Sequence, residues 1–210
     1  GDTTMRGYIL DGFPRTVDQA DALAKITASR PLDVVIDLDV DRDVVLQRLV
    51  HTVNETCNIG TLLNGEVVYL DRVEADHWPL RLHYTTGSRV PLHCSAIGKL
   101  YLALASSVRR RRLLQSLDLR RFTGTTLTDA ARLEAELRQI RKEQVSFDRE
   151  EYLVGVVCMA VPVIGSNGEL LAALAIQAPA ARMNVQTARR HLPALRQAAE
   201  ELAGIFQDRP

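Results

Sequence analysis

The pattern of apolar and polar positions predicts two kinds of structure, with a change near residue 50. In the first part, short apolar runs at 7–10 and 34–38 each precede a segment with helical spacing, at 17–26 and 44–50. Asp41 stands where the N-cap of the second helix should lie. Strand, helix, strand and helix with short connections form half of a parallel α/β unit, which is too small to enclose a core alone.

After residue 50, the apolar runs come in pairs that are joined by turn residues. Asn64-Gly65 separates the runs 56–63 and 66–73, and this dipeptide favours the two-residue type I′ turn of a β-hairpin. The same pairing predicts a second hairpin around the turn 165–168. The other predicted strands cover residues 80–85, 152–164 and 169–177.

The stretch 89–99 marks a change from an extended segment to a helix. Pro91 lacks a backbone donor and favours extended geometry before it, and Ser95 stands where an N-cap should. The N–H groups that open such a helix, together with its dipole, can receive a carboxylate or a phosphate. We expect these donors on Ala96, Ile97 and Gly98. A capped helix that only packs on a sheet fits the same residues.

Two further amphipathic helices complete the pattern. Thr128 is the expected cap of a helix with an apolar stripe at Leu133, Leu137 and Ile140. Apolar residues spaced three and four apart from Leu192 to Phe206 predict a terminal helix that covers the sheet. The chain is therefore expected to have an α+β fold, an antiparallel sheet flanked by helices, preceded by an N-terminal βαβα segment of α/β type.

Composition and charge narrow the function classes. The 210 residues have a net charge of zero and 46% hydrophobic content, and their first fifty carry a charge of −3. No segment is basic enough to predict nucleic-acid binding, and the run 109–112 of four arginines is better explained as a solvated helix face. Neither a membrane helix nor a signal peptide is recognisable, so we expect a cytoplasmic protein that does not contact a membrane.

Cysteine usage argues against several kinds of site. Cys57, Cys94 and Cys158 are scattered, which predicts small core residues and neither a disulfide framework nor a zinc site. His93 precedes Cys94, but neighbours on a strand point to opposite faces, so this pair is a poor catalytic dyad. No metal, cofactor or catalytic residue is predicted.

Small residues leave room above the predicted sheet. Val156, Cys158 and Ala160 share one face of their strand, and Ala173, Ala175 and Gln177 share one face of the next. This face could form a pocket with Cys158 and Gln177 as its polar edges, or it could receive a packed helix.

The segment 7–48 resembles the adenylate kinase family. The resemblance rests on the motif 11–20, Asp-Gly-Phe-Pro-Arg-Thr-Val-Asp-Gln-Ala, between the two predicted strands. It implies that Arg15 and Gln19 hold a nucleoside monophosphate and that Asp11 lies near magnesium. The glycine loop, its lysine and the lid arginines of that family are missing from the chain, so we expect this fragment to be inactive as a phosphotransferase.

The segment 46–206 resembles the effector-binding domain of the isocitrate-lyase-regulator (IclR) family of bacterial transcriptional regulators. The matching motifs are 64–70, 87–99, 126–129, 147–151 and 155–163. The resemblance implies a GAF-like ligand-sensing domain, forming dimers or tetramers, that binds a small carboxylated or aromatic metabolite. The implied ligand-binding residues are Ala96, Ile97, Asp148, Cys158, Ala175 and Gln177.

The two resemblances predict a chimera of an incomplete kinase-like fragment, 1–45, and an effector-binding domain, 46–210. Members of the second family also carry a winged helix-turn-helix, which is not recognisable here, so we expect no DNA binding by this chain. Ala175 and Gln177 stand where family members that bind very small keto acids tend to have hydroxyl residues, which favours a more apolar acid. The alternatives are nucleotide binding by Asp11, Arg15 and Gln19, and a first segment that acts only as a helical cap or a dimer partner.

Overall fold

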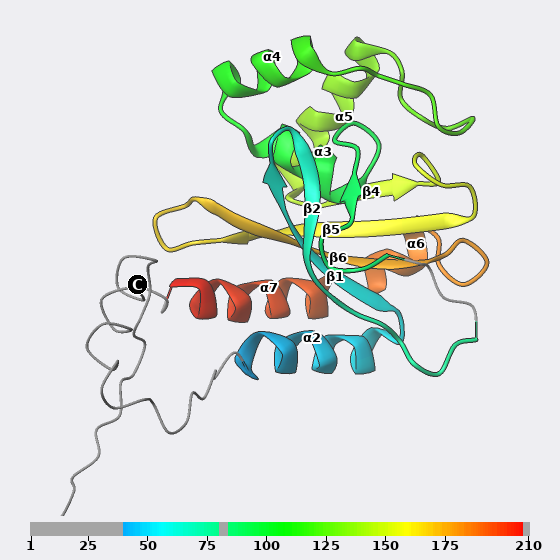
Figure 1. Ribbon diagram of the computed structural model, residues 1–210, viewed down its shortest axis with the longest axis vertical. Coiled ribbons are helices and arrows are strands. Elements are labelled where there is room, and N and C mark those ends of the chain that lie inside the picture. The colour runs from blue at the N-terminus through cyan, green and yellow to red at the C-terminus, as the bar shows by residue number, and fades with distance from the viewer. Residues whose placement is uncertain (1–39, 80–83, 208–210) are drawn as a thin grey trace, which may run out of the picture.

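The computed structural model describes residues 40–79 and 84–207, which form two helical layers around one antiparallel sheet (Figure 1). In the described residues the sheet has six strands in the order β3-β2-β1-β6-β5-β4. The strands are β1 (Thr56–Leu63), β2 (Glu66–Val73), β3 (Arg89–Val90), β4 (Ser146–Arg149), β5 (Val156–Ile164) and β6 (Leu170–Pro179). The helices are α2 (Val40–Val53), α3 (Ala96–Leu104), α4 (Ser107–Ser116), α5 (Ala130–Glu143), α6 (Val185–Arg190) and α7 (Leu192–Gln207).

The first hairpin has the turn that its sequence predicts. Asn64 and Gly65 both have positive φ, 52° and 84°, as a type I′ turn requires, and β1 and β2 begin and end at the predicted residues. Strand β1 also pairs with β6, so the two hairpins join at the centre of the sheet. The segment 57–60 of β1 is therefore paired with β2 on one side and with β6 on the other.

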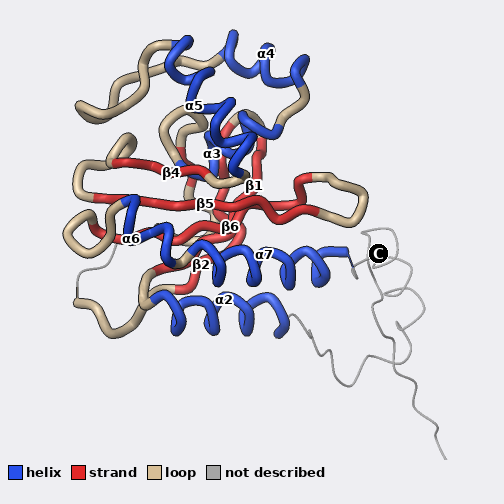
Figure 2. The backbone as a smooth tube through the Cα atoms, turned by 180° about the vertical axis from the view of Figure 1, so that it is seen from behind, coloured by secondary structure: helices blue, strands red, loops and turns tan. Residues whose placement is uncertain are grey.

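Helices α2 and α7 lie side by side on one face of the sheet, α3 lies on the other face, and α5 packs against α3 (Figures 1 and 2). The predicted stripe of α7 is buried at Leu195, Ala199 and Leu202, and that of α5 at Leu133, Leu137 and Ile140. Each face thus has its own apolar core, as expected when the apolar stripe of a helix meets one face of a pleated sheet. The α+β class is confirmed.

Several predicted boundaries are wrong. The cap of α5 is Asp129, whose carboxylate accepts from the N–H of Arg132, so the helix begins one residue later than predicted from Thr128. Strand β5 begins at Val156, because Glu150 and Gly155 have positive φ and form a turn where the apolar run predicted a strand. Asp41 lies inside α2, and Tyr84 with its successor is not in a strand.

Other predictions fall outside the described residues. These are the strand over 80–83, the whole βαβα segment 1–39 and the kinase-like positions Asp11, Arg15 and Gln19. Helix α2 spans the domain boundary predicted at residues 45 and 46, and that boundary stays a prediction.

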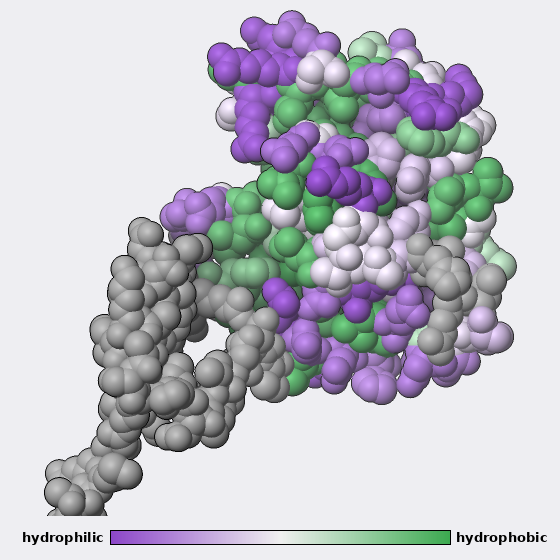
Figure 3. All heavy atoms as spheres, in the orientation of Figure 1, coloured by the Kyte–Doolittle hydropathy of each residue, from purple (hydrophilic) through white to green (hydrophobic). Residues whose placement is uncertain are grey.

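The arginine run lies on α4, where hydrophilic side chains gather at the top of the molecule in Figure 3. Arg109, Arg111 and Arg112 are exposed, as predicted for a solvated face. Arg110 is half-buried, and it donates to the carbonyl oxygen of Ala105 at 3.0 Å. Within residues 40–79 and 84–207, no helix has the length and apolar character needed to cross a bilayer.

Candidate ligand-binding site

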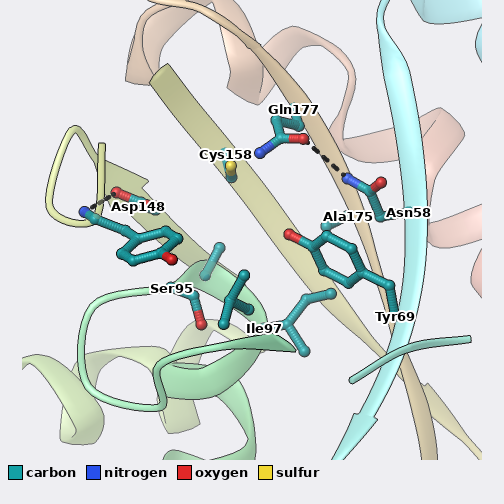
Figure 4. A pocket seen from close by; sticks show the side chains of 11 residues that line it. Asn58, Tyr69, Ser95, Ile97, Asp148, Cys158, Ala175 and Gln177 are labelled. Carbon is teal, nitrogen blue, oxygen red and sulfur yellow. Dashed lines mark hydrogen bonds between the residues drawn. The ribbon is translucent and has the colours of Figure 1, made fainter. Parts of the chain in front are cut away.

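A small cavity lies between the start of α3 and the sheet (Figure 4). All six residues that the sequence suggested as ligand-binding line it: Ala96, Ile97, Asp148, Cys158, Ala175 and Gln177. The sheet supplies the last four from three neighbouring strands, β4, β5 and β6. The remaining lining residues are Asn58, Tyr69, Val90, Ser95 and Tyr152.

Ser95 caps α3 and so decides which backbone donors face the cavity. Its Oγ accepts from the N–H of Gly98 at 3.1 Å and donates to the carbonyl oxygen of Pro91 at 2.5 Å. The sequence suggested three open donors, on Ala96, Ile97 and Gly98. The prediction for Gly98 is wrong, because its N–H donates to the Ser95 cap. In the part of the chain that the structure describes, the N–H groups of Ala96 and Ile97 have no hydrogen-bond partner, and both residues are buried.

Gly98 lets the loop before α3 fold back closely onto the helix. A Cβ at this position would lie 2.5 Å from both the Cα and the carbonyl oxygen of Leu92, which are backbone atoms that cannot swing away. Glycine in a helix costs about 1 kcal/mol relative to alanine. The close approach of Leu92 to the start of α3 therefore requires glycine at position 98.

The polar residues of the sheet form one row across three strands. Asp148 lies opposite Cys158, and Cys158 lies opposite Gln177, so the antiparallel register places all three side chains on the face of α3. Asn58 lies opposite Ala175 on the same face, and its Nδ2 donates to Oε1 of Gln177 at 3.4 Å (Figure 4). The cavity thus has an amide end and a carboxyl end.

Asp148 is the acidic group of the cavity and is only 3% exposed. Burial raises the pKa of its carboxyl to about 7, although the N–H groups of Glu151 and Tyr152, which donate to Oδ1 at 2.7 and 3.4 Å, favour the charged form. The charge of Glu151 raises this pKa further. Asp148 can therefore carry a proton near neutral pH and donate it in a hydrogen bond.

A buried ion-pair network lies behind the carboxyl end. The Nζ of Lys99, fully buried on α3, donates to Oε1 of Glu151 at 2.5 Å and to Oε1 of Glu136 at 3.5 Å. Arg149 pairs with Glu136 at 2.7 Å. Oε2 of Glu151 is buried and has no partner among the described residues. The network joins α3, α5 and the segment after β4 into one charged unit.

Threonine hydroxyls hold the loop that follows β4. Thr123 and Thr125 donate to the carbonyl oxygen of Glu150 at 2.7 and 2.8 Å, and Thr126 donates to that of Glu151 at 2.6 Å. Glu150 has a φ of 60°, a conformation that non-glycine residues rarely adopt. These bonds stabilise the turn that carries the N–H donors to Asp148.

The cavity is nearly filled in this structure. The space within it is about 10 Å³, enough for one water molecule. In Figure 4, Tyr69 and Ile97 reach into it from the side opposite Asp148. A ligand larger than water therefore requires these side chains to move.

The chemistry of the cavity fits binding better than nucleophilic attack. Burial raises the pKa of the Cys158 and Cys94 thiols well above the ordinary value, which is the opposite of activation. The ring of His93 contacts the carbonyl oxygen of Arg120 through Nε2 at 3.0 Å. The described residues also contain no group of three or more His, Cys, Asp or Glu side chains that could hold a metal ion.

The sequence did not suggest Asn58, Tyr69, Val90 or Tyr152 as lining residues, and it identified Ser95 only as a helix cap. Asn58 carried a usable signal, because an amide within an otherwise apolar strand must find a polar partner when buried. Tyr69 and Tyr152 carried none, since aromatic residues in apolar runs ordinarily belong to a core.

Comparison with known proteins places this chain and its fold in one family. The family model for the bacterial transcriptional regulator IclR C-terminal region matches residues 34–203. SauR of Cupriavidus necator, a probable transcriptional regulator, is 46% identical over 165 residues, which are 79% of this chain and 65% of SauR. The regulator BhcR of Paracoccus denitrificans is 36% identical over 159 residues, 76% of this chain and 57% of BhcR. The chain thus spans about three fifths of the length of these relatives.

Solved structures agree. The inducer-binding domain of the PobR transcription factor from Acinetobacter, a double mutant in complex with 3-hydroxybenzoic acid, has a TM-score of 0.73 at 27% identity, covering 80% of this chain and 98% of that one. The C-terminal domain of the Escherichia coli regulator KdgR has a TM-score of 0.70 at 28% identity, covering 80% and 98%. By sequence and by fold, the chain belongs to the IclR family of bacterial transcriptional regulators and contains its C-terminal effector-binding domain.

Proposed function

We propose that the cavity between α3 and the sheet binds a small organic or aromatic acid as the effector of a transcriptional regulator. The observation that carries this proposal is the pair of N–H groups of the buried residues Ala96 and Ile97, which begin α3 on the cavity side and have no hydrogen-bond partner among the described residues. A carboxylate satisfies both donors and also interacts favourably with the helix dipole. Asp148, Cys158, Ala175 and Gln177 then set the selectivity of the site.

The related PobR domain supports an acid of this class, because its crystal structure holds 3-hydroxybenzoic acid. The small side chain of Ala175 leaves room over β6, which suits a ring or a short aliphatic chain. Since the cavity is nearly filled, binding requires Tyr69 and Ile97 to move apart. The energy for this movement comes from the ligand's carboxylate contacts, so we expect apolar molecules without an acid group to bind poorly.

We infer that the domain binds its ligand without chemical turnover. A thiol nucleophile needs a lowered pKa and a base within hydrogen-bond reach, and burial raises the pKa of Cys94 and Cys158. In the whole regulator we expect DNA contacts through a winged helix-turn-helix, assembly into dimers or tetramers, and action in the cytoplasm.

A thermal-shift screen tests the proposal. The protein is melted with small organic acids, with aromatic acids including 3-hydroxybenzoate, and with AMP and ATP. A ligand that binds only the folded state raises the melting temperature by mass action. We expect a shift with acids that is lost in Cys158→Trp, whose side chain fills the cavity, and is kept in Cys158→Ser, which preserves its volume.

Two outcomes would overturn the proposal. A shift with nucleotides alone would favour the kinase-like positions Asp11, Arg15 and Gln19. A shift with acids that persists in a folded Cys158→Trp protein, with an unchanged circular dichroism spectrum, would place the acid elsewhere.

A further inference from the structure

A buried arginine lies behind the amide end of the cavity, outside its lining. Arg72 is on β2, three residues after Tyr69, so in a regular strand the two side chains would point to opposite faces. The register of β1 and β2 shifts here: Gly60 lies opposite Tyr69, but Ile59 lies opposite Asp71. Leu70 is thus an extra residue, and this bulge turns Arg72 onto the face of the cavity.

The contacts of Arg72 fix the two amides in front of it. Its Nη1 donates to Oδ1 of Asn58 at 2.7 Å and to Oε1 of Gln177 at 3.0 Å. The side chain is 4% exposed, its Nε donates to Glu74 at 3.2 Å, and its guanidinium carbon lies 5.8 Å from the centre of the Tyr84 ring. The guanidinium is therefore held in one place by contacts on several sides.

These contacts decide which way the amides point. A guanidinium has donors only, so both amide oxygens must face Arg72. The Nδ2 of Asn58 is then used on Oε1 of Gln177. The NH₂ group of Gln177 is left on the cavity side, where Figure 4 shows it directed toward Cys158. The amide end of the cavity therefore presents donors to a ligand.

We propose that Arg72 is a positioning residue that holds the NH₂ of Gln177 toward the cavity and thereby selects an effector with a second oxyanion, in addition to the carboxylate received by α3. The effector class is a short or aromatic dicarboxylic acid. This inference rests on the proposed function, since it assumes that Ala96 and Ile97 receive the first carboxylate. The amide of Gln177 lies between Arg72 and the second group of the ligand. The permanent positive charge of Arg72 therefore favours an anion at that position over a neutral group or a hydrogen-bond donor.

Matched acids measure this selectivity. One series is propionate, malonate and 3-aminopropionate, and the other is benzoate, isophthalate and 3-aminobenzoate. Within each series the molecules differ mainly in the second group: the first acid has none, the second has a carboxylate, and the third has an amino group, which is a hydrogen-bond donor. Dissociation constants are measured by calorimetry for the wild-type protein, Arg72→Met, Arg72→Lys and the control Arg189→Met. Arg189 lies on the surface of α6 and pairs with Glu143, the last residue of α5.

In the wild-type protein and in Arg189→Met, we expect the diacid of at least one series to bind about tenfold more tightly than its monoacid, and the amino acid to bind most weakly. In Arg72→Met the amide of Gln177 is free to turn, so the ratio of diacid to monoacid affinity falls to about one. Arg72→Lys keeps the charge and restores part of this ratio. A loss of stability alone would weaken both acids equally and leave the ratio unchanged.

Two results would overturn this inference, and they differ from each other. If monoacids bind and the diacid preference is absent, or is the same in Arg72→Met, the role of Arg72 fails while the proposed function stands. If no acid of either series binds the wild-type protein, and the wider acid screen also gives no thermal shift, the proposed function fails and this inference fails with it.

Discussion

The two faces of the sheet differ in the chemistry of what they bury. Against α2 and α7 the described side chains form a continuous apolar cluster that includes Ile59, Met159 and Leu202. Against α3 and α5 the apolar cluster is interrupted by buried polar groups, which include Asn58, Lys99, Asp148, Glu151 and Gln177. Buried polar groups stabilise a fold weakly and only when paired, so we expect the second face to contribute less to stability than the first.

The largest expected effect concerns the ion pairs on the cavity face. Lys99→Met removes the charge that compensates Glu151, so we expect a loss of about 3–5 kcal/mol in the free energy of unfolding. Urea denaturation measures it. The double variant Lys99→Met/Glu151→Gln should regain a large part of the loss, because it no longer buries an uncompensated carboxylate. A single variant as stable as the wild-type protein would contradict the role given to this network.

The next effect concerns the apolar face. Leu202 is fully buried on α7, and Leu202→Ala should cost about 3 kcal/mol through lost burial and a cavity. Because α7 lies across the sheet from the proposed binding site, we expect the affinity for acids to change less than twofold at a temperature where the variant is folded. Urea denaturation and calorimetry measure the two quantities, and a large loss of affinity would show that the two faces are coupled.

The third effect is a pH dependence of stability that arises from Asp148 on the cavity face. The pKa of Asp148 is about 7 in the folded protein and about 3.9 in an unfolded chain, so the folded state holds an extra proton between these values. The stabilising contribution of this proton is present below pH 4, falls as the pH rises and is lost above pH 7. Relative to Asp148→Asn, the wild-type protein should lose on the order of 2 kcal/mol between pH 5 and pH 8.

Urea denaturation of both proteins at the two pH values measures this difference. The comparison with Asp148→Asn cancels the contributions of other carboxyl groups, such as Glu136, whose pKa is lowered by the charge of Lys99 against the opposing effect of burial. A difference that stays constant with pH, or that grows in favour of the wild-type protein, would contradict the burial of Asp148 in a proton-binding state.

The smallest expected effect tests how closely α3 approaches the sheet. A Cβ at Gly60 would lie 3.1 Å from the carbonyl oxygen of Val68 and 3.2 Å from Cδ1 of Ile97. Gly60→Ala should therefore cost about 1 kcal/mol and displace Ile97. Because Ile97 lines the cavity, acid affinity should fall as well. Stability and affinity are measured as above, and an unchanged affinity would mean that Ile97 does not need its present position.

Features that depend on neighbouring residues could be predicted from the sequence. Asn64-Gly65 determined its turn because both residues tolerate positive φ, and Ser95 capped its helix as expected. Local signals failed where a long-range contact competed with them. Apolar residues from Tyr152 onward favoured a strand, but Glu150 and its neighbours are held in a turn by the threonine hydroxyls of a distant loop.

In the candidate site too, some residues could be predicted from the sequence and others could not. The six lining residues came from a family resemblance, and the structure brings them together in one cavity. Arg72 and Lys99 could not be found in that way. The position of Arg72 depends on a one-residue bulge, and that of Lys99 on partners 37 and 52 residues away. Neither the bulge nor the distant partners can be predicted from the local pattern of apolar and polar residues.

One measurement tests the division of the two faces most directly. The acid with the largest thermal shift is titrated into ¹⁵N-labelled protein, and the amide signals are followed by NMR. The account predicts the largest changes at the N–H groups of Ala96 and Ile97 and at the side-chain NH₂ of Gln177, with little change along α7 from Leu195 to Leu202. Changes concentrated on α2 and α7, with Ala96 and Ile97 unaffected, would contradict it.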